Sequence, residues 1–297
     1  MDGILLLRKP AGVTSFQALA PVKKKFPKTK IGHCGTLDRF ASGLLILLLG
    51  RMTRMNPVFS GLDKAYRATF HFGVQTDTLD PEGVIIAQAD CPKDVSVLDP
   101  LHFCGIQKQV PPEYSAIHVN GRRASERMRR GEKPELSARD ICIHKLDVRG
   151  ELPDVEIDVT CSKGTYIRSL ARDMGLHAGS CAMVKELERY WIGHYGGEEK
   201  NGFFLHNARL AQDVSPEKDV LSAWQALQAL PHIPRVHARP EFVHHIRAGR
   251  ALKYEWFTNE WKGDFVVVFD ADSQLLALVN SRGGRLSYGF VAAEDKE

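Results

Sequence analysis

The most informative segment of the chain reads Gly32-His33-Cys34-Gly35-Thr36-Leu37-Asp38 and continues to Ala41-Ser42-Gly43. Its glycines allow the backbone to turn tightly and to approach a ligand closely. A carboxylate presented in such a loop has the chemistry of a nucleophile or of a general base. A single loop aspartate more often caps a helix or forms an Asx turn. The segment therefore marks a candidate site whose meaning depends on the rest of the chain.

Buried strands are expected on both sides of this loop. Residues 3–7 are apolar and end at a Lys-Pro-Ala-Gly turn, and residues 44–49 form a second apolar run. Between them, Thr14 or Ser15 is suited to cap a helix that continues to about Lys25, because a side-chain oxygen can accept from the free amides of a first turn. We therefore expect strand, helix, a loop over residues 32–43, and strand.

Further elements follow from periodicity. Residues 66–72 alternate as a half-buried strand, residues 76–83 have turn chemistry, and a short strand is expected over 84–87. Another strand is expected over 155–161. A helix over 165–177 places four apolar residues on one face, namely Ile167, Leu170, Ala171 and Met174.

Composition limits the class of protein. The chain has 297 residues, which suggests about two domains. Hydrophobic residues make up 43% of the chain and six cysteines are scattered through it, which excludes collagen, low-complexity disorder and a disulfide scaffold. The cysteines have no zinc-ligand spacing, so we expect reduced thiols, no metal and a cytoplasmic protein. No secretory signal is evident and the apolar runs are shorter than the ~20 residues of a membrane span.

The charge balance permits a nucleic-acid partner without requiring one, since 40 Lys and Arg stand against 36 Asp and Glu. Residues 107–139 are more basic than their surroundings. This segment contains Pro111-Pro112 and Tyr114 together with Lys108, Arg122, Arg123, Arg127, Arg129, Arg130, Lys133 and Arg139. We interpret it as an RNA-facing insertion, and a solvated helix face is the alternative.

Residues after Pro231 differ in pattern. Strand signals lie at 265–269 and 275–279, separated by a turn, and a Gly283-Gly284 pair follows. We expect a domain over 1–231 that carries the basic insertion, and a small β-rich domain over 232–297.

Six segments in this order resemble the TruB family of tRNA pseudouridine synthases. They are Lys9-Pro10-Ala11-Gly12-Val13-Thr14-Ser15, Gly32 to Asp38, Lys64-Ala65-Tyr66-Arg67 with Gly73 to Gly83, Gln109 to Ile117, Lys163-Gly164-Thr165-Tyr166-Ile167-Arg168-Ser169-Leu170, and Leu187-Glu188-Arg189. The resemblance covers about residues 3–193. It implies an α+β (mixed α/β) catalytic domain with a central mixed sheet, and a C-terminal β-rich domain that resembles a PUA domain only loosely.

The resemblance also implies an activity, the isomerisation of uridine 55 in the T loop of tRNA to pseudouridine. The uracil leaves C1′, rotates and is reattached through C5 without redox change, so no cofactor is expected. The target base must leave its stack, which costs a few kcal/mol. An aromatic surface and a basic surface are therefore needed around the site.

Catalytic roles are carried over to three residues. Asp38 matches the catalytic aspartate, acting on the sugar or on C6 of the uracil. Tyr66 matches the tyrosine that stacks on the flipped base, with a core aromatic as the alternative. Arg168 matches the arginine that pairs with the aspartate and stabilises its charged form; an ordinary surface arginine is the alternative.

Substrate contacts are assigned to a second group. His33 matches a residue that handles the extruded loop, and Leu187 matches an apolar pocket wall. The full group expected to contact the substrate is His33, Leu187, Lys9, Arg39, Arg122, Arg123 and Lys163.

This chain departs from the family pattern at three positions. Arg39 and Phe40 stand where the family often has Pro and Leu, and Arg39 has the charge to contact a phosphate. Ser125 replaces an aromatic residue of the basic insertion. These departures concern RNA contacts rather than the chemistry.

Other functions remain open at this stage. The guide-RNA-dependent branch of the family modifies other RNAs with protein partners, whereas this chain lacks basic tails and is expected to act as a monomer on the T stem-loop of free tRNA, away from membranes. A non-catalytic tRNA chaperone is a second alternative. A glycoside hydrolase would need a second acid such as Asp77 or Asp80, and their turn-like context gives it no support.

Overall fold

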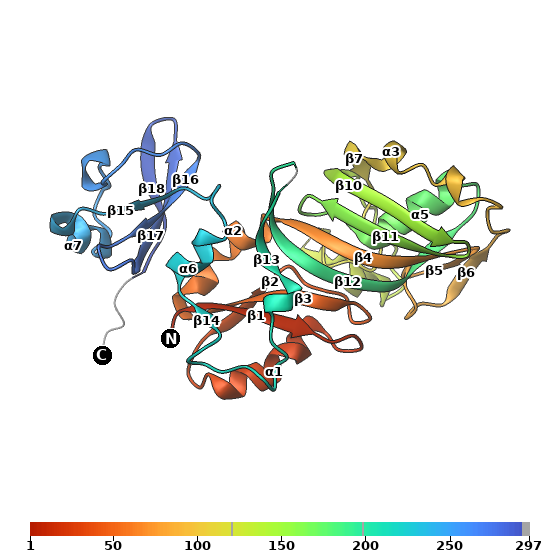
Figure 1. The fold of residues 1–297 in the computed structure, drawn as a ribbon, viewed down its shortest axis with the longest axis horizontal. Coiled ribbons are helices and arrows are strands. Elements are labelled where there is room, and N and C mark those ends of the chain that lie inside the picture. Colours follow the sequence, from red (N-terminus) through yellow and green to blue (C-terminus); the bar gives the residue numbers. More distant parts are fainter. Residues whose placement is uncertain (120, 198, 293–297) are drawn as a thin grey trace.

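The computed structural model describes residues 1–119, 121–197 and 199–292. Its main sheet has ten strands, with β14-β1-β3-β12-β4-β11-β10-β7 in order, β2 paired to β3 and β13 paired to β12 (Figure 1). The strands are β1 (Gly3–Lys9), β2 (Ile31–Cys34), β3 (Ser42–Leu49), β4 (Asp63–Phe72), β7 (Gly105–Gln109), β10 (Arg139–Glu151), β11 (Asp154–Cys161), β12 (Ala182–Tyr195), β13 (Lys200–Phe204) and β14 (Val220–Leu221).

Shorter elements pack around this sheet, except α7, which packs on β17 of the C-terminal sheet described below. The helices are α1 (Ser15–Lys25), α2 (Asn56–Ser60), α3 (Pro100–Phe103), α4 (Ala124–Met128), α5 (Ile167–His177), α6 (Ala223–Gln228) and α7 (Val243–Arg247). Two short hairpins are formed by β5 (Val74–Thr76) with β6 (Ile85–Gln88), and by β8 (His118–Val119) with β9 (Arg122–Arg123). The mixed α/β class is thus confirmed. Within the described residues, no helix is long and apolar enough to cross a membrane.

The continuous apolar runs of β1 and β3 are explained by burial on both faces. Leu5 and Leu7 pack with α1 in one core cluster, whereas Ile4 and Leu6 pack in another with α2 and α6. A strand covered on both sides has no solvent face and so reads as an unbroken hydrophobic stretch. Helix α1 begins as expected, with the Thr14 side chain accepting from Gln17 N in a capping box.

Strands β3 and β12 form the parallel junction of the sheet. They pair only at Ser42 with Glu188 and at Gly43 with Arg189. Gly43 has φ +118°, and a Cβ there would lie 2.3 Å from the Arg189 carbonyl oxygen, so only glycine fits. This close junction brings the loop before β3 against β4 and β12.

The expected strands at 155–161 and 66–72 and the expected helix at 165–177 are confirmed by β11, β4 and α5. The expected loop over 32–43 is too long, because residues 31–34 pair with β3 as β2. Strands β10 and β12 were not expected from periodicity. Strand β12 contains two register shifts, between Val184 and Glu186 and between Arg189 and Trp191, which break its alternation.

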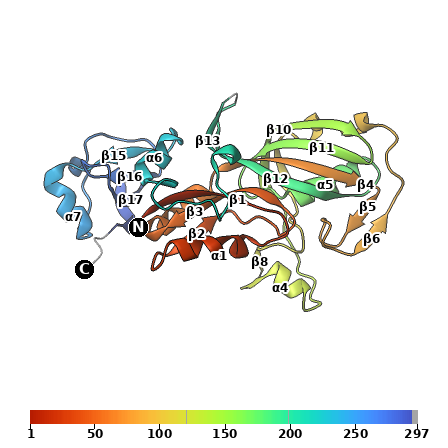
Figure 2. The same cartoon turned by 60° about the horizontal axis from the view of Figure 1, so that its bottom comes forward.

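The basic insertion leaves the main sheet between β7 and β10. Figure 2 shows its helix α4 and hairpin strand β8 projecting below the sheet, away from the C-terminal strands. We call residues 110–138 the finger. The sheet continues across the insertion because β7 pairs directly with β10.

The C-terminal residues form a separate four-stranded sheet. It has the order β15 (Arg235–His237), β16 (Phe265–Phe269), β17 (Leu275–Arg282) and β18 (Arg285–Val291). The strand signals at 265–269 and 275–279 and the glycine turn are confirmed. The sheet is not isolated, because Phe269, Leu278 and Phe290 belong to the same core cluster as Ile4 and Leu227. A boundary near residue 231 stays a prediction.

Candidate active site

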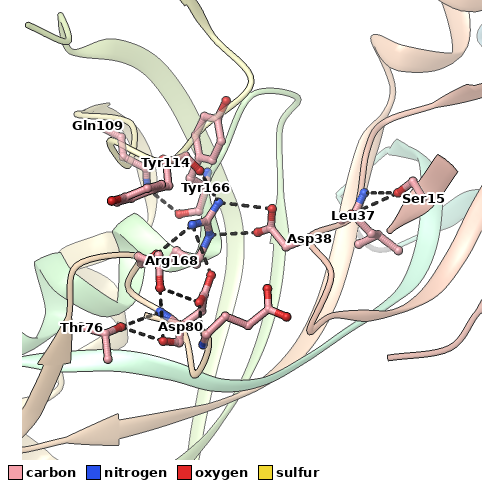
Figure 3. A network of polar contacts seen from close by, with 11 residues as sticks. Ser15, Leu37, Asp38, Thr76, Asp80, Gln109, Tyr114, Tyr166 and Arg168 are labelled. Carbon is pink, nitrogen blue, oxygen red and sulfur yellow. Dashed lines mark hydrogen bonds and ion pairs between the residues drawn. The ribbon is translucent and has the colours of Figure 1, made fainter. Parts of the chain in front are cut away.

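The loop that presents Asp38 is fixed on both sides of the aspartate. The Ser15 hydroxyl accepts from Leu37 N at 2.9 Å and donates to Leu37 O at 3.0 Å (Figure 3). On the other side, Gly12 N donates to Arg39 O at 2.8 Å. The start of α1 and the turn before it therefore hold residues 35–44, which we call the Asp38 loop, in place. The Asp38 side chain remains 40% exposed.

Lys9 does not have the predicted position of a substrate contact. Its side chain is fully buried, and Nζ donates to Pro10 O at 2.9 Å, Val13 O at 2.6 Å and Arg39 O at 3.3 Å. Burial lowers the pKa of Lys9 to about 8. The buried ammonium group donates to three carbonyls and so joins the turn before α1 to the Asp38 loop. The role of Lys9 is therefore structural.

Asp38 forms an ion pair with Arg168 from α5. Arg168 Nε lies 2.9 Å from Asp38 Oδ2, and Nη2 donates to Oδ1 at 3.2 Å. The arginine side chain is only 5% exposed, which excludes an ordinary surface arginine. The two-nitrogen contact orients the carboxylate as well as neutralising it.

The same guanidinium gathers two further segments. Nη1 donates to Thr78 O at 2.8 Å and lies 3.3 Å from Asp80 Oδ2, and Nη2 donates to Tyr114 O at 3.0 Å. Burial is the main cause that raises the pKa of Asp80, against the opposing effects of Thr78 and Arg168. Arg168 is thus the centre of the network in Figure 3, and it links the Asp38 loop, the 76–83 turn and the finger.

Asp80 was not assigned to this site from the sequence. Its side chain is 6% exposed. It is held by the Thr78 hydroxyl at 2.6 Å and by Glu82 N at 3.0 Å. The signal available in the sequence was the turn chemistry of residues 76–83, which does not show that the carboxylate points inward.

The first turn of α5 is anchored to the root of the finger. Gln109 Oε1 accepts from Tyr166 N at 2.8 Å, and Gln109 Nε2 donates to Tyr166 O at 3.1 Å. Ser169 donates its hydroxyl to Val110 O at 2.8 Å. These contacts join two of the family-like segments, residues 109–117 and 163–170, and they set the position of Arg168.

Tyr66 and Leu187 lie on the same side of the sheet. Tyr66 on β4 and Leu187 on β12 are each 8% exposed and belong to one core cluster with Leu37. Burial is the main cause that raises the pKa of Tyr66. Leu187 also lines a groove of about 540 Å³ together with Phe40 and Ser42. Phe40 lies two residues beyond Asp38, so this groove adjoins the Asp38 loop, although Asp38, Tyr66 and Arg168 are not among its lining residues.

Arg189 is a second buried arginine that the sequence did not single out as a site residue. It is 1% exposed, and it donates from Nε to Leu44 O and from Nη2 to Gly35 O, both at 2.8 Å. It opposes Tyr66 in the β4–β12 register. The Arg189 side chain therefore connects both ends of the Asp38 loop to β12, the strand that pairs with β4 at Tyr66. Its signal was the Leu-x-Arg pattern alone.

The remaining predicted contacts lie at different depths. His33 on β2 is partly buried, its Nδ1 has no hydrogen-bond partner within the described residues, and burial followed by Arg189 lowers its pKa. Arg39 is exposed, donates from Nε to Gly12 O at 3.0 Å and lies 3.7 Å from Glu82. Lys163 is exposed in the loop before α5, and Arg122 and Arg123 are exposed on β9 of the finger.

The cysteines and acidic residues were checked for other chemistry. None of the six cysteines forms a disulfide. In the described part of the chain, no group of three His, Cys, Asp or Glu side chains is arranged to hold a metal ion.

Residues 23–167 match the N-terminal domain of the TruB family of pseudouridylate synthases. The tRNA pseudouridine synthase B of Borreliella burgdorferi is 33% identical over 289 residues, covering 95% of this chain and 96% of the relative. That of Aquifex aeolicus is 33% identical over 295 residues, covering 97% and 98%. This chain belongs to the TruB family. The Treponema denticola protein of the same name is 42% identical over 226 residues, which span 69% of this chain and 63% of the relative.

Solved structures agree with the TruB fold. A Cbf5-Nop10-Gar1 complex contains a chain with a TM-score of 0.67 and 25% identity, covering 99% of this chain and 84% of that one. An H/ACA RNP bound to a substrate RNA containing 2′-deoxyuridine gives 0.64 at 23% identity, covering 94% and 78%. The second likeness is one of fold.

Proposed function

We propose that this TruB-family chain is a tRNA pseudouridine synthase that isomerises uridine 55 in the T loop. Relatives that align over nearly the whole chain are tRNA pseudouridine synthases B. The single observation that carries the assignment to residues is the Asp38–Arg168 ion pair. It leaves the carboxylate 40% exposed beside a buried guanidinium, in the loop that the family-like motif defines.

The reaction breaks the bond between N1 of the uracil and C1′ and forms a bond between C5 and C1′. C5 loses its proton and N1 gains one, so the overall composition is unchanged. Asp38 supplies an oriented carboxylate, which acts either on the sugar, at C1′ or the 2′ proton, or at C6 of the uracil. Arg168 holds this carboxylate and is itself fixed by Asp80, Thr78 and Tyr114. The Asp38 carboxylate is therefore oriented before the substrate binds, so the reaction does not have to supply the free energy of orienting it.

Binding of the flipped base is assigned to the sheet side of the site. Tyr66 offers a ring for stacking, with Leu187 as an apolar wall, and His33 handles the extruded loop. Stacking on an aromatic side chain contributes about 1–3 kcal/mol per base. The exposed cations Arg39, Arg122, Arg123 and Lys163 add sequence-independent attraction for RNA phosphates.

We also propose that the enzyme acts as a monomer on free tRNA in the cytoplasm, by recognising the T stem-loop without a protein partner. Support comes from relatives that align over nearly their entire length. By contrast, the structural neighbour with 25% identity belongs to a Cbf5-Nop10-Gar1 complex. Partner-dependent modification of another RNA is the outcome that would replace this proposal.

The deciding experiment measures tritium release from tRNA transcripts that carry 5-tritiated uridine. The purified chain should release tritium without other components, because the C5 proton departs when the new carbon–carbon bond forms. Replacing uridine 55 by cytidine should abolish the release. Asp38→Asn should retain tRNA binding and lose turnover, since stacking and phosphate contacts survive the substitution.

Each alternative has its own signature in this assay. Release that persists without uridine 55 would move the activity to another position or RNA. Tight tRNA binding without any release by the wild type would support the chaperone reading. Normal turnover by Asp38→Asn would remove Asp38 from the catalytic role.

A further inference from the structure

A second group of reactive side chains lies on the opposite face of the main sheet. Ile141 and Ile143 of β10 point into the core cluster that contains Tyr66. Because side chains alternate along a strand, Cys142 is directed to the other face. A bulge interrupts the β10–β11 pairing at residue 144, and the contact between His144 Nδ1 and Cys142 Sγ places the imidazole beside the thiol. The site that they form is separate from the Asp38 site and independent of the tRNA reaction.

The His144 imidazole lies between Cys142 and Asp63, with one ring nitrogen near each of them. Cys142 Sγ lies 3.6 Å from His144 Nδ1, and His144 Nε2 lies 3.4 Å from Asp63 Oδ1. A nucleophile in contact with a base that a third group orients is the general signature of an activated nucleophile, and such contacts are often loose without a substrate. The order here is thiol, Nδ1, Nε2, carboxylate.

The imidazole is held in this position from two sides. The Tyr195 ring packs against His144, with 5.2 Å between ring centroids and an interplanar angle of 31°. Tyr195 N in turn donates to Asp63 Oδ2 at 3.1 Å. The Asp63 side chain is 18% exposed and that of His144 is 24% exposed, so both are shielded but reachable.

The contact with the thiol identifies the ring nitrogen that can act as the base. Cys142 Sγ lies 3.6 Å from His144 Nδ1. Within the described residues His144 Nε2 is buried and makes no hydrogen bond, and the Asp63 carboxylate, 3.4 Å away, acts on the ring through its charge. In the tautomer that carries its proton on Nε2, the lone pair on Nδ1 faces the thiol and can take a proton from Cys142.

We propose that Cys142, His144 and Asp63 form a reactive-thiol site that is oxidised by small hydroperoxides. The thiol sulfur attacks the terminal oxygen of the peroxide, an S–O bond forms and the O–O bond breaks. His144 Nδ1 takes the thiol proton, and the departing alkoxide or hydroxide receives a proton. Sulfur is oxidised by two electrons to the sulfenic acid, and the peroxide is reduced to an alcohol or water.

The pKa directions fit a base-assisted step rather than a resting thiolate. Burial, followed by the Asp63 charge, raises the pKa of Cys142. The thiol is therefore neutral at rest, and its reactivity depends on proton transfer to His144. The other titratable groups that interact with this set are Cys104, Cys161, Lys64 and His232.

The chain supplies its own matched controls. Cys91 and Cys104 are partly buried like Cys142, and burial raises the pKa of both thiols. Within the described residues neither thiol contacts an imidazole, whereas Cys142 does. A difference in reactivity between Cys142 and these two thiols reports the contribution of His144.

The test treats the intact protein with hydrogen peroxide in the presence of dimedone, and mass spectrometry follows each cysteine peptide with time. We expect Cys142 to be trapped at least about tenfold faster than Cys91 and Cys104, a modest part of the ~10²–10⁴-fold that a positioned base provides. The Cys142 rate should depend less steeply on pH than that of the control thiols, because a neighbouring base takes its proton. The control thiols, which need thiolate, should rise by about tenfold per pH unit.

Trapping of Cys142 at the rate of the two control thiols, or with their pH profile, would overturn the proposal in the wild type alone. His144→Gln should lower the Cys142 rate to that of the controls and leave theirs unchanged. A Cys142 rate unaffected by this substitution would also overturn it. Tritium release should be unchanged in Cys142→Ser, because this thiol is outside the tRNA site.

Discussion

At the residue scale, one guanidinium stands between two carboxylates in different surroundings. Asp38 is 40% exposed and Asp80 is 6% exposed, and Arg168 contacts both. The exposed carboxylate is accessible to a substrate, whereas the buried one is accessible only to protein. We therefore propose separate roles: Asp38 is the reacting carboxylate, and Asp80 keeps Arg168 in place.

Replacing Asp80 tests this division. Asp80→Asn removes the charge that fixes Arg168 while keeping an oxygen for Glu82 N, so kcat should fall by up to about 10²-fold through misplacement of Asp38. The affinity for tRNA should change little. Tritium release under single-turnover conditions, together with filter binding, measures the two effects.

The matched control is Asp77→Asn in the same turn, since the Asp77 carboxylate accepts from Val84 N and, in the described part of the chain, does not contact Arg168. It should retain kcat. Equal losses in both variants would mean that the turn as a whole, rather than the Asp80 charge, supports the site.

Lys64 gives a prediction for pH and stability. Its side chain is 7% exposed, and burial lowers its pKa to about 8. Below that pH the buried charge disfavours the folded state relative to a neutral residue. Between pH 8 and the ordinary lysine pKa of 10.5 the unfolded chain holds the extra proton, so stability should rise with pH.

Urea unfolding of the wild type and Lys64→Met at about pH 7 and about pH 10 measures this difference, and the wild type should gain on the order of 2 kcal/mol relative to the variant. Lys108→Met is the control, because Lys108 is exposed. A wild-type advantage that does not change with pH would contradict the buried charge.

At the element scale, α5 is positioned from its first turn rather than along its length. Gln109 is 4% exposed and pairs with both backbone groups of Tyr166, the residue before the helix. Gln109→Leu leaves the N–H and the carbonyl of Tyr166 without this partner, which costs about 1–3 kcal/mol of folding free energy for each group.

We expect Gln109→Leu to lower both the free energy of unfolding and kcat, because Arg168 lies two residues beyond Tyr166. Urea denaturation and tritium release measure the two quantities. Gln109→Glu keeps the acceptor for Tyr166 N and replaces the donor to Tyr166 O, so its loss should show which contact matters. A stable, fully active Gln109→Leu variant would show that the contacts between Gln109 and Tyr166 do not position Arg168.

The elements that sequence could predict are those with one clear period. Tyr66, Ala68, Phe70 and Phe72 are all buried on β4, as alternation requires, and α5 buries its four expected apolar residues. Strand β12 escaped because its two register shifts move the buried positions out of step. Periodicity describes one strand at a time, and a shift is fixed by the neighbouring strands.

At the scale of the whole molecule, cations on the finger should attract the phosphates of the RNA. Arg122→Ala with Arg123→Ala removes two exposed charges without touching the Asp38 network. The dissociation constant for tRNA should rise, and the slope of its logarithm against that of salt should fall by about two if both contact phosphate. The value of kcat should be retained.

Arg149→Ala, which removes an exposed charge from β10, is the control for a general change of charge. It should leave the salt slope unchanged. An unchanged slope in the finger double variant would place the RNA elsewhere on the surface.

The candidate site was predictable only as far as motifs reach. Asp38, Tyr66 and Arg168 were assigned through short patterns that are far apart in the chain, and the structure brings Asp38 and Arg168 into contact. Asp80 and Arg189 were missed, and Lys9 was placed in contact with RNA. These three depend on which way a polar side chain points, and a local pattern does not contain that direction.

The core shared by the two sheets has a consequence for synthesis of the chain. Ile4 on β1 packs in one cluster with Val267 on β16, Leu278 on β17 and Phe290 on β18. Domains generally fold as the nascent chain emerges, N-terminal part first. Here that cluster cannot close until β16–β18 have been synthesised, so the apolar side chains that β1 contributes to it stay uncovered while the residues in between are translated.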